Sequence, residues 1–115
     1  MKNLSPMARR LIGSLSQDVG RSTGVDHLLP EHVILALLQS KNGIGYQVCV
    51  DLKINVDRFI FRLKSYFGEH EPKSAYDDLP FGHRFIKMQD LADIESNSLS
   101  NDYTGTEHFL LAAIR

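Results

Sequence analysis

Two stretches of the chain share the same order of polar and apolar residues. Glu31-His32 opens an apolar run over residues 33–38, and Glu107-His108 opens another over residues 109–114. The two pairs lie 76 residues apart (107 − 31). An uninterrupted apolar run of this length indicates a helix that is buried on more than one side. A buried helix that occurs twice predicts a helical unit that also occurs twice.

The first turn of each of these helices carries residues suited to a helix start. A carboxylate at Glu31 or Glu107 meets the positive end of the helix dipole and the unpaired backbone N–H groups. Thr106 precedes Glu107 and is predicted to be the N-cap of the second helix. Pro30 takes the same place in the first copy, and a first helical turn tolerates proline.

A further helix is predicted near the N-terminus. Ser5 supplies a capping hydroxyl and Pro6 occupies the first helical position, while Gly20 and Gly24 bracket the end of the helix. Its apolar residues recur at helical spacing and are Ala8, Leu11, Ile12, Leu15 and Val19.

The first unit continues beyond the first Glu-His helix, which is expected to end at about Ser40. Residues 41–45 indicate a turn, and residues 46–52 predict about two helical turns. Asn55 is predicted to cap one more helix, which stops at Gly68. The apolar face of that helix consists of Val56, Phe59, Ile60, Leu63 and Phe67.

The second unit repeats only part of this order. A helix over about 82–99 and a loop over 100–105 lead to the second Glu-His helix, with no counterparts of the third and fourth helices after it. We therefore predict an all-α fold of two pseudo-repeated helical units. The first repeat covers residues 1–68, a charged linker covers 69–80, and a truncated second repeat covers 81–115.

The composition narrows the classes of function. The chain has 115 residues, 43% hydrophobic and 23% charged, as expected of one globular domain. Its formal net charge of −1 gives no support to broad binding of nucleic acids or membrane surfaces. The charge is uneven: residues 1–76 carry ten Lys or Arg against seven Asp or Glu, and residues 77–115 carry three against seven. An acidic second half would favour cationic segments of a partner, although a solvated helix face gives the same pattern.

The chain contains a single cysteine, Cys49, which excludes an internal disulfide and favours a reducing compartment. No apolar run approaches the roughly 18 residues that span a bilayer. Residues 1–10 lack the apolar core of a signal peptide. These observations predict a cytoplasmic location.

His27, Glu31 and His32 have spacings that could suggest metal ligands, because residues four apart share a helix face. His27 is expected to lie in a loop, however, and His108 repeats His32 without a partner that resembles His27. We therefore assign both motif histidines to packing or capping, and we predict no metal site.

Catalytic chemistry finds little support in the sequence. Cys49 lies between two valines, which indicates a buried, unreactive thiol. Asp77 and Asp78 fall in the linker, while Asp90 and Asp93 fall on a helix face that is expected to be solvated. The Gly-x-Gly at residues 43–45 lacks the preceding strand and the Lys-Ser/Thr of a phosphate-binding loop.

A helical DNA-binding module is an alternative, because this sequence predicts helices joined by short glycine-containing turns, as such modules have. Such a module needs a basic recognition helix. The two Glu-His helices are apolar and carry no cluster of Lys or Arg, which argues against this alternative.

Several motifs resemble the N-terminal domain of the Clp ATPases, the AAA+ unfoldases related to ClpA and ClpC. They lie at residues 5–11, 31–38, 43–45, 50–57 and 103–111, and they read SPMARRL, EHVILALL, GIG, VDLKINVD and YTGTEHFLL. The resemblance covers nearly the whole chain and implies a domain of two four-helix repeats. The first helix of the second repeat departs from the family pattern.

The resemblance implies recognition and not catalysis. Domains of this family bind adaptor proteins or protein substrates and pass them to the ATPase ring of a Clp protease. The implied domain has no cofactor of its own, and any ATPase activity would lie in a downstream AAA+ module. A second interpretation within the resemblance is a stand-alone accessory protein that docks on a Clp protease without ATPase activity.

The resemblance also implies a binding site. In ClpC-like members the glutamate of each Glu-His motif helps to hold phosphoarginine, which marks proteins for degradation. The matching positions are Glu31 and Glu107, with the hydroxyl of Thr106 as a further candidate contact. Pro30 replaces the corresponding threonine in the first repeat, where that hydroxyl is therefore lost. The alternative is that each glutamate only stabilises its own helix.

Overall fold

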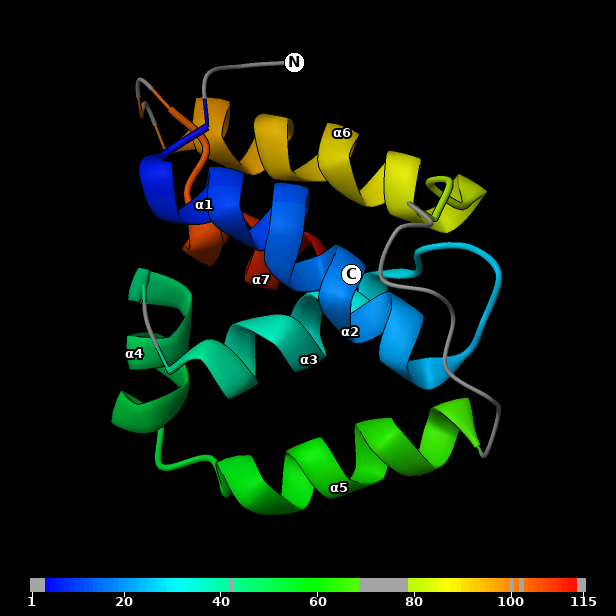
Figure 1. The fold of residues 1–115 in the computed structure, drawn as a ribbon. Coiled ribbons are helices and arrows are strands. Elements are labelled where there is room, and N and C mark those ends of the chain that lie inside the picture. Colours follow the sequence, from blue (N-terminus) through cyan, green and yellow to red (C-terminus); the bar gives the residue numbers. More distant parts are fainter. Residues whose placement is uncertain (1–3, 42, 69–78, 100, 102, 114–115) are drawn as a thin grey trace.

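The computed structural model describes residues 4–41, 43–68, 79–99, 101 and 103–113. Within these ranges the chain forms helices and no strand, which confirms the all-α prediction (Figure 1). The helices are α1 (Pro6–Arg10), α2 (Ser16–Thr23), α3 (Pro30–Ser40), α4 (Gly43–Asp51), α5 (Val56–Phe67), α6 (His83–Ser98) and α7 (Thr106–Ala113). A π-helical segment, Leu11–Leu15, joins α1 to α2 without a break. No helix in the described ranges is long and apolar enough to cross a membrane.

Local capping explains where several helices begin and end. The Ser5 hydroxyl accepts a hydrogen bond of 3.2 Å from the Ala8 N–H, and the Asn55 side chain accepts one of 3.1 Å from the Arg58 N–H. Gly68 follows the last residue of α5. These starts and this stop were expected, because each depends on residues only a few positions apart.

Gly20 has a different role from the predicted one. The helix runs through it to Thr23 and ends at Gly24, whose φ of 79° lies in the left-handed region. A Cβ on Gly20 would lie 2.6 Å from Leu28 Cδ2 and 2.8 Å from Leu79 Cδ1. Glycine is therefore kept inside this helix because two side chains from distant segments pack against its backbone.

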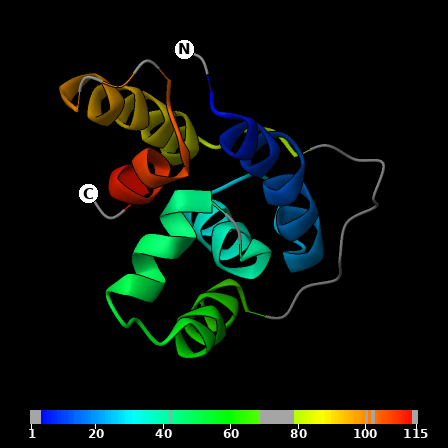
Figure 2. The ribbon, with the colours of Figure 1, turned by 90° about the vertical axis from the view of Figure 1, so that its left-hand side faces the viewer.

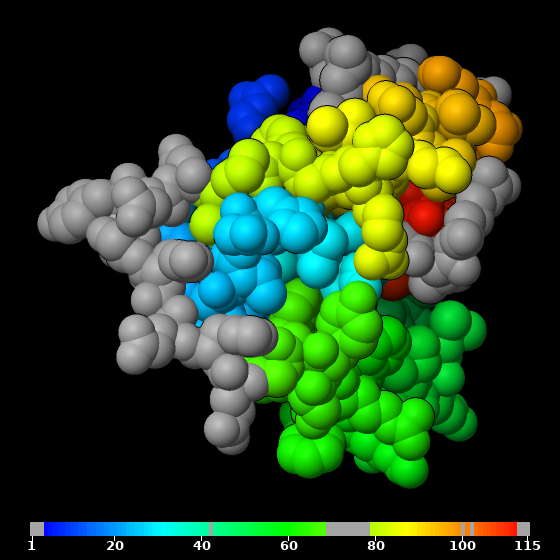
Figure 3. Space-filling view, turned by 90° about the vertical axis from the view of Figure 1, so that its right-hand side faces the viewer, coloured from blue at the N-terminus to red at the C-terminus, as the bar shows by residue number. Residues whose placement is uncertain are grey.

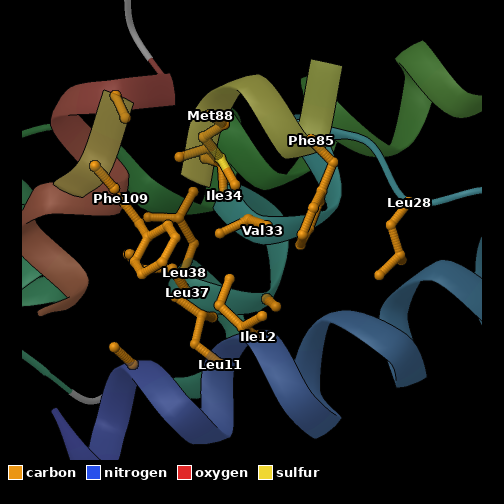
Figure 4. Packing of buried hydrophobic residues seen from close by; sticks show 14 of the residues in the cluster. Leu11, Ile12, Leu28, Val33, Ile34, Leu37, Leu38, Phe85, Met88 and Phe109 are labelled. Carbon is orange, nitrogen blue, oxygen red and sulfur yellow. The ribbon is translucent and has the colours of Figure 1, made fainter. Parts of the chain in front are cut away.

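Helix α3 is the centre of the fold. Pro30 and all residues from 32 to 38 are buried, and α3 packs against α2, α4, α5, α6 and α7. The close-up in Figure 4 shows the side chains of α3 between those of the π-helical segment Leu11–Leu15, α6 and α7. The apolar run after Glu31-His32 is thus surrounded by other helices, as its length predicted. Figure 2 shows the second Glu-His helix, α7, beside the start of α4, with which it packs closely.

The two repeats are joined by a pair of matching backbone contacts. Leu28, two residues before α3, forms an isolated parallel bridge with Phe81, just before α6. Thr104, two residues before α7, forms one with Leu4, just before α1. Thr104 follows Leu28 by 76 residues (104 − 28), the same offset as between the Glu-His pairs. Each repeat therefore pairs the segment before its Glu-His helix with the start of the other repeat.

The C-terminal end of the predicted linker packs into the core, while residues 69–78 lie outside the described ranges. Leu79 is 7% exposed. The side-chain amide of Gln17 donates to the Leu79 carbonyl at 3.0 Å and accepts from the Leu79 N–H at 2.8 Å. One buried glutamine thereby satisfies both backbone groups of a residue 62 positions away.

We expect Gln17→Ala to lower the free energy of unfolding by about 2 kcal/mol, because it leaves a buried N–H and a buried carbonyl without partners. Urea unfolding followed by circular dichroism measures the change. Gln47→Ala is the matched control, since that amide bonds only an exposed neighbour on its own helix, Asp51. Equal stability losses in the two variants would contradict the role assigned to Gln17.

Candidate functional site

The two motif histidines hold the starts of their helices. The Leu29 N–H donates to Nδ1 of His32 at 2.9 Å, and the Gly105 N–H donates to Nδ1 of His108 at 2.7 Å. In return, the backbone N–H groups of His32 and His108 donate to the backbone carbonyls of Leu29 and Gly105. Each histidine therefore closes a reciprocal capping box, which confirms the predicted capping role.

The other ring nitrogen of each histidine is also engaged. Nε2 of His32 lies 3.0 Å from the Thr23 hydroxyl, and Nε2 of His108 lies 2.9 Å from the side-chain amide of Asn101. The His32 ring is fully buried and stacks on Phe67 with 4.3 Å between centroids. Burial outweighs the attraction of the neighbouring Glu31 carboxylate and lowers the pKa of His32 to about 4. His32 is therefore a neutral structural residue near pH 7, with neither nitrogen open to a metal.

The expected capping role of Thr106 is wrong. Thr106 is the first residue of α7 and is 3% exposed. Its hydroxyl accepts a hydrogen bond of 2.9 Å from the N–H of Gly45, near the start of α4. The hydroxyl joins two helices that are distant in sequence, while the histidine three positions after Gly105 supplies the cap.

The side chains of Glu31 and Glu107 are largely shielded from solvent. They are 19% and 21% exposed, respectively. Oε1 of Glu31 and Oε2 of Glu107 are both buried without a hydrogen-bond partner. A buried carboxylate oxygen without a donor is costly, and it is a position that a ligand with N–H groups would satisfy.

Each glutamate lines a pocket. The pocket at Glu107 has a volume of about 280 Å³ and lies where the starts of α1, α4 and α7 meet. We call it the Glu107 pocket. No lysine or arginine is found among the described residues that line it, which are Ser5, Pro6, Met7, Gly43, Ile44, Tyr103, Gly105, Thr106 and Glu107.

The pocket at Glu31 is larger and has a different lining. It measures about 510 Å³ and lies between the start of α3 and the length of α5. Figure 3 shows the segment before α3 and its start, in cyan, bordered by the start of α6 above and by α5 below. The described lining of this Glu31 pocket is Glu31, Ile54, Asn55, Arg58, Phe59, Arg62, Leu63 and Tyr66.

Glu31 already has an internal partner. Nη1 of Arg84, near the start of α6, donates to Oε2 of Glu31 at 3.2 Å, and the Arg84 side chain is 60% exposed. The charge of the Glu31 carboxylate and this hydrogen bond raise the pKa of Arg84 above its usual value. The structure thus places a guanidinium from the second repeat on the glutamate of the first.

The sequence reasoning missed the cations of the Glu31 pocket. Arg58 and Arg62 lie four residues apart on α5, so their common face was readable from helical spacing. Arg84 follows Glu31 by 53 positions, and no local pattern connects the two. The elements of the Glu107 pocket also meet only through tertiary packing.

The sequence raised three further kinds of candidate: metal ligands, the cysteine and the aspartates. No group of three His, Cys, Asp or Glu that could hold a metal occurs among the described residues. Cys49 is 2% exposed, as expected, and burial raises the pKa of its thiol. Asp93 accepts a hydrogen bond from the Thr104 hydroxyl, while Asp77 and Asp78 lie outside the described ranges.

The structure defines an all-α domain of repeated helices with a pocket beside each Glu-His helix. The Clp repeat (R) N-terminal domain model matches residues 3–115. The chain therefore belongs to the Clp repeat N-terminal domain family.

Curated relatives come from three branches of Clp proteins. The chain is 28% identical over 100 residues to a ClpA homolog of Trieres chinensis and covers 87% of itself and 11% of that protein. It is 27% identical over 112 residues to ClpC of Staphylococcus epidermidis, with coverages of 97% and 13%. It is 28% identical over 102 residues to the chaperone ClpB of Oceanobacillus iheyensis, with coverages of 89% and 12%. The chain thus spans about one eighth of the length of these relatives.

Solved structures share the fold. The Hsp104 N-terminal domain from Candida albicans superposes with a TM-score of 0.80 at 14% identity, covering 99% of this chain and 75% of that one. A protein of a malarial protein secretion system superposes with a TM-score of 0.82 at 16% identity, with coverages of 96% and 76%. At these identities the likeness shows the fold alone.

Proposed function

We propose that this chain recognises protein substrates or adaptor proteins for a Clp-type AAA+ unfoldase that works with a Clp protease. Membership of the Clp repeat family supports this role, because its relatives carry the matching segment in Clp ATP-binding subunits and chaperones. Helix α3, the first of the two Glu-His helices that a DNA-binding module would have to present to a groove, is the buried centre of this fold.

The proposed ligand of the Glu107 pocket is a phosphorylated guanidinium group, as in phosphoarginine. The observation that carries the proposal is the unpartnered Oε2 of Glu107 in a pocket whose described lining holds no competing cation. A guanidinium donates paired hydrogen bonds to a carboxylate. Gly43 and Ile44 line the same pocket at the start of α4, and N–H groups at a helix start favour a phosphate.

We expect Glu107→Gln to weaken phosphoarginine binding at least about tenfold, because a neutral amide offers one acceptor oxygen and no charge. Isothermal titration of the amino acid phosphoarginine into the two proteins measures the effect. Asp90→Asn removes an exposed carboxylate outside the described lining of both pockets and should leave the affinity unchanged.

Circular dichroism of Glu107→Gln establishes that the variant is folded. Phosphoserine, which carries the phosphate without the guanidinium, should bind much more weakly than phosphoarginine. An unchanged phosphoarginine affinity in folded Glu107→Gln would remove the glutamate from the site, and the helix-stabilising alternative would stand.

A further inference from the structure

The two glutamate pockets differ in the residue that the repeat places beside each glutamate. Leu4 and Phe81 are the bridging residues that precede α1 and α6. Met7 and Arg84 each lie three positions further on (4 + 3 and 81 + 3). Met7 lines the Glu107 pocket, while Arg84 bonds the carboxylate of Glu31. The repeat therefore places a thioether beside one glutamate and a guanidinium beside the other.

Arg84 supplies the Glu31 pocket with the group that an arginine ligand would bring. Its guanidinium lies 3.2 Å from Oε2 of Glu31, and the two charges cancel. A second guanidinium would have to displace Arg84 or share one carboxylate with it, so the repulsion between two like charges opposes its entry.

The remaining charge of the Glu31 pocket is positive. Arg58 and Arg62 are exposed on α5, and neither forms an ion pair with a residue in the described ranges. Ile54, Phe59 and Leu63 line the space beside them. The pocket thus combines apolar walls with two cations that form no ion pair within the described ranges, because Glu31, the carboxylate in its described lining, is paired with Arg84.

We propose that the Glu31 pocket binds an acidic protein segment in which Asp or Glu residues flank apolar ones, while guanidinium ligands are confined to the Glu107 pocket. The apolar side chains would enter between Ile54, Phe59 and Leu63, and the carboxylates would accept hydrogen bonds from Arg58 and Arg62. The second half of the proposal rests on the function proposed above; the first half does not depend on it.

A fluorescein-labelled peptide of alternating Asp and Leu residues tests the first half by fluorescence anisotropy. A peptide with Lys in place of each Asp is the matched probe and should bind more weakly. Arg58→Gln/Arg62→Gln should raise the dissociation constant of the acidic peptide about tenfold or more, since hydrogen bonds to charged groups are lost. Added salt should weaken the wild-type complex.

The control variant is Arg9→Gln/Arg10→Gln, which removes the same charge from exposed positions on α1, outside the described lining of the pocket. It should keep the wild-type dissociation constant within about twofold, because distant exposed charges are screened. Absent binding of the acidic peptide, equal binding of the Lys peptide, or equal losses in the two double variants would overturn the proposal.

Substitutions that exchange Met7 and Arg84 test whether guanidinium ligands are confined to the Glu107 pocket. Arg84→Met should free Glu31 and raise the number of phosphoarginine molecules bound per chain from one to two, as measured by isothermal titration. Met7→Arg should close the Glu107 pocket and abolish the wild-type site. Two molecules bound by the wild-type chain would overturn the confinement to one pocket. Absence of any phosphoarginine binding would instead refute the ligand proposed for the Glu107 pocket, and the acidic peptide would still decide the Glu31 pocket.

Discussion

Replacing Phe109 by alanine is expected to lower the free energy of unfolding by about 3–5 kcal/mol. Phe109 lies in α7 with 0% of its surface exposed and belongs to the main apolar cluster with Ile34, Leu37 and Leu38 of α3 (Figure 4). The substitution removes a buried ring and leaves a cavity where the two Glu-His helices meet. A domain of this size has a total stability of about 5–15 kcal/mol, so a large share of it is lost.

Urea unfolding followed by circular dichroism measures this loss. Phe61→Ala is the matched control, because it makes the same chemical change on α5 at a side chain that is 70% exposed. The control should change the free energy of unfolding by less than about 0.5 kcal/mol. A similar loss in both variants would show that Phe109 does not occupy the core position described.

The free energy of unfolding should decrease as the pH falls from about 6.5 to about 4. His32 titrates near 6.5 in an unfolded chain, and burial lowers its pKa to about 4 in the folded protein. Between these values the unfolded chain binds a proton that the folded chain does not, so acid favours unfolding. The loss amounts to about 1.4 kcal/mol per pH unit at most, and on the order of 3 kcal/mol over the whole window. The loss levels off as the pH falls through this folded pKa of about 4, because the folded chain then binds the proton as well.

Denaturant unfolding at a series of pH values between 7 and 4 measures the slope. His32→Gln should be less stable at pH 7 and should show a slope that is smaller by up to one proton. His83→Gln, at an exposed position at the start of α6, should keep the slope of the wild-type protein. An identical pH dependence in His32→Gln and the wild type would contradict the buried, neutral state of His32.

The sequence predicted those features of the fold that depend on neighbouring residues. Ser5 and Asn55 cap helices through contacts three positions away, so their effect is readable along the chain. The apolar run after Glu31-His32 predicted a buried helix, because only a helix covered on several sides tolerates such a run. The 76-residue offset predicted the repeat, and matching bridges before α3 and α7 follow it.

The candidate site was predictable only in part. Repetition pointed to Glu31 and Glu107, and each of them lines a pocket. The sequence did not predict which carboxylate has an internal cationic partner, because Arg84 reaches Glu31 only through the packing of α6 near α3. Thr106 shows the same limit: its local context suits an N-cap, but the approach of α4 gives its hydroxyl a different donor.

The sequence by itself determined the order of the helices, the caps at Ser5 and Asn55, the repeat and the pair of glutamates, since hydrophobic period and capping act over a few residues. The tertiary structure alone decided why Gly20 lies inside a helix, how Gln17 holds Leu79, and which glutamate has an internal guanidinium. These outcomes depend on contacts between residues dozens of positions apart. Two copies of one motif thus acquired different pockets, because a side chain takes its charge environment from the elements packed around it.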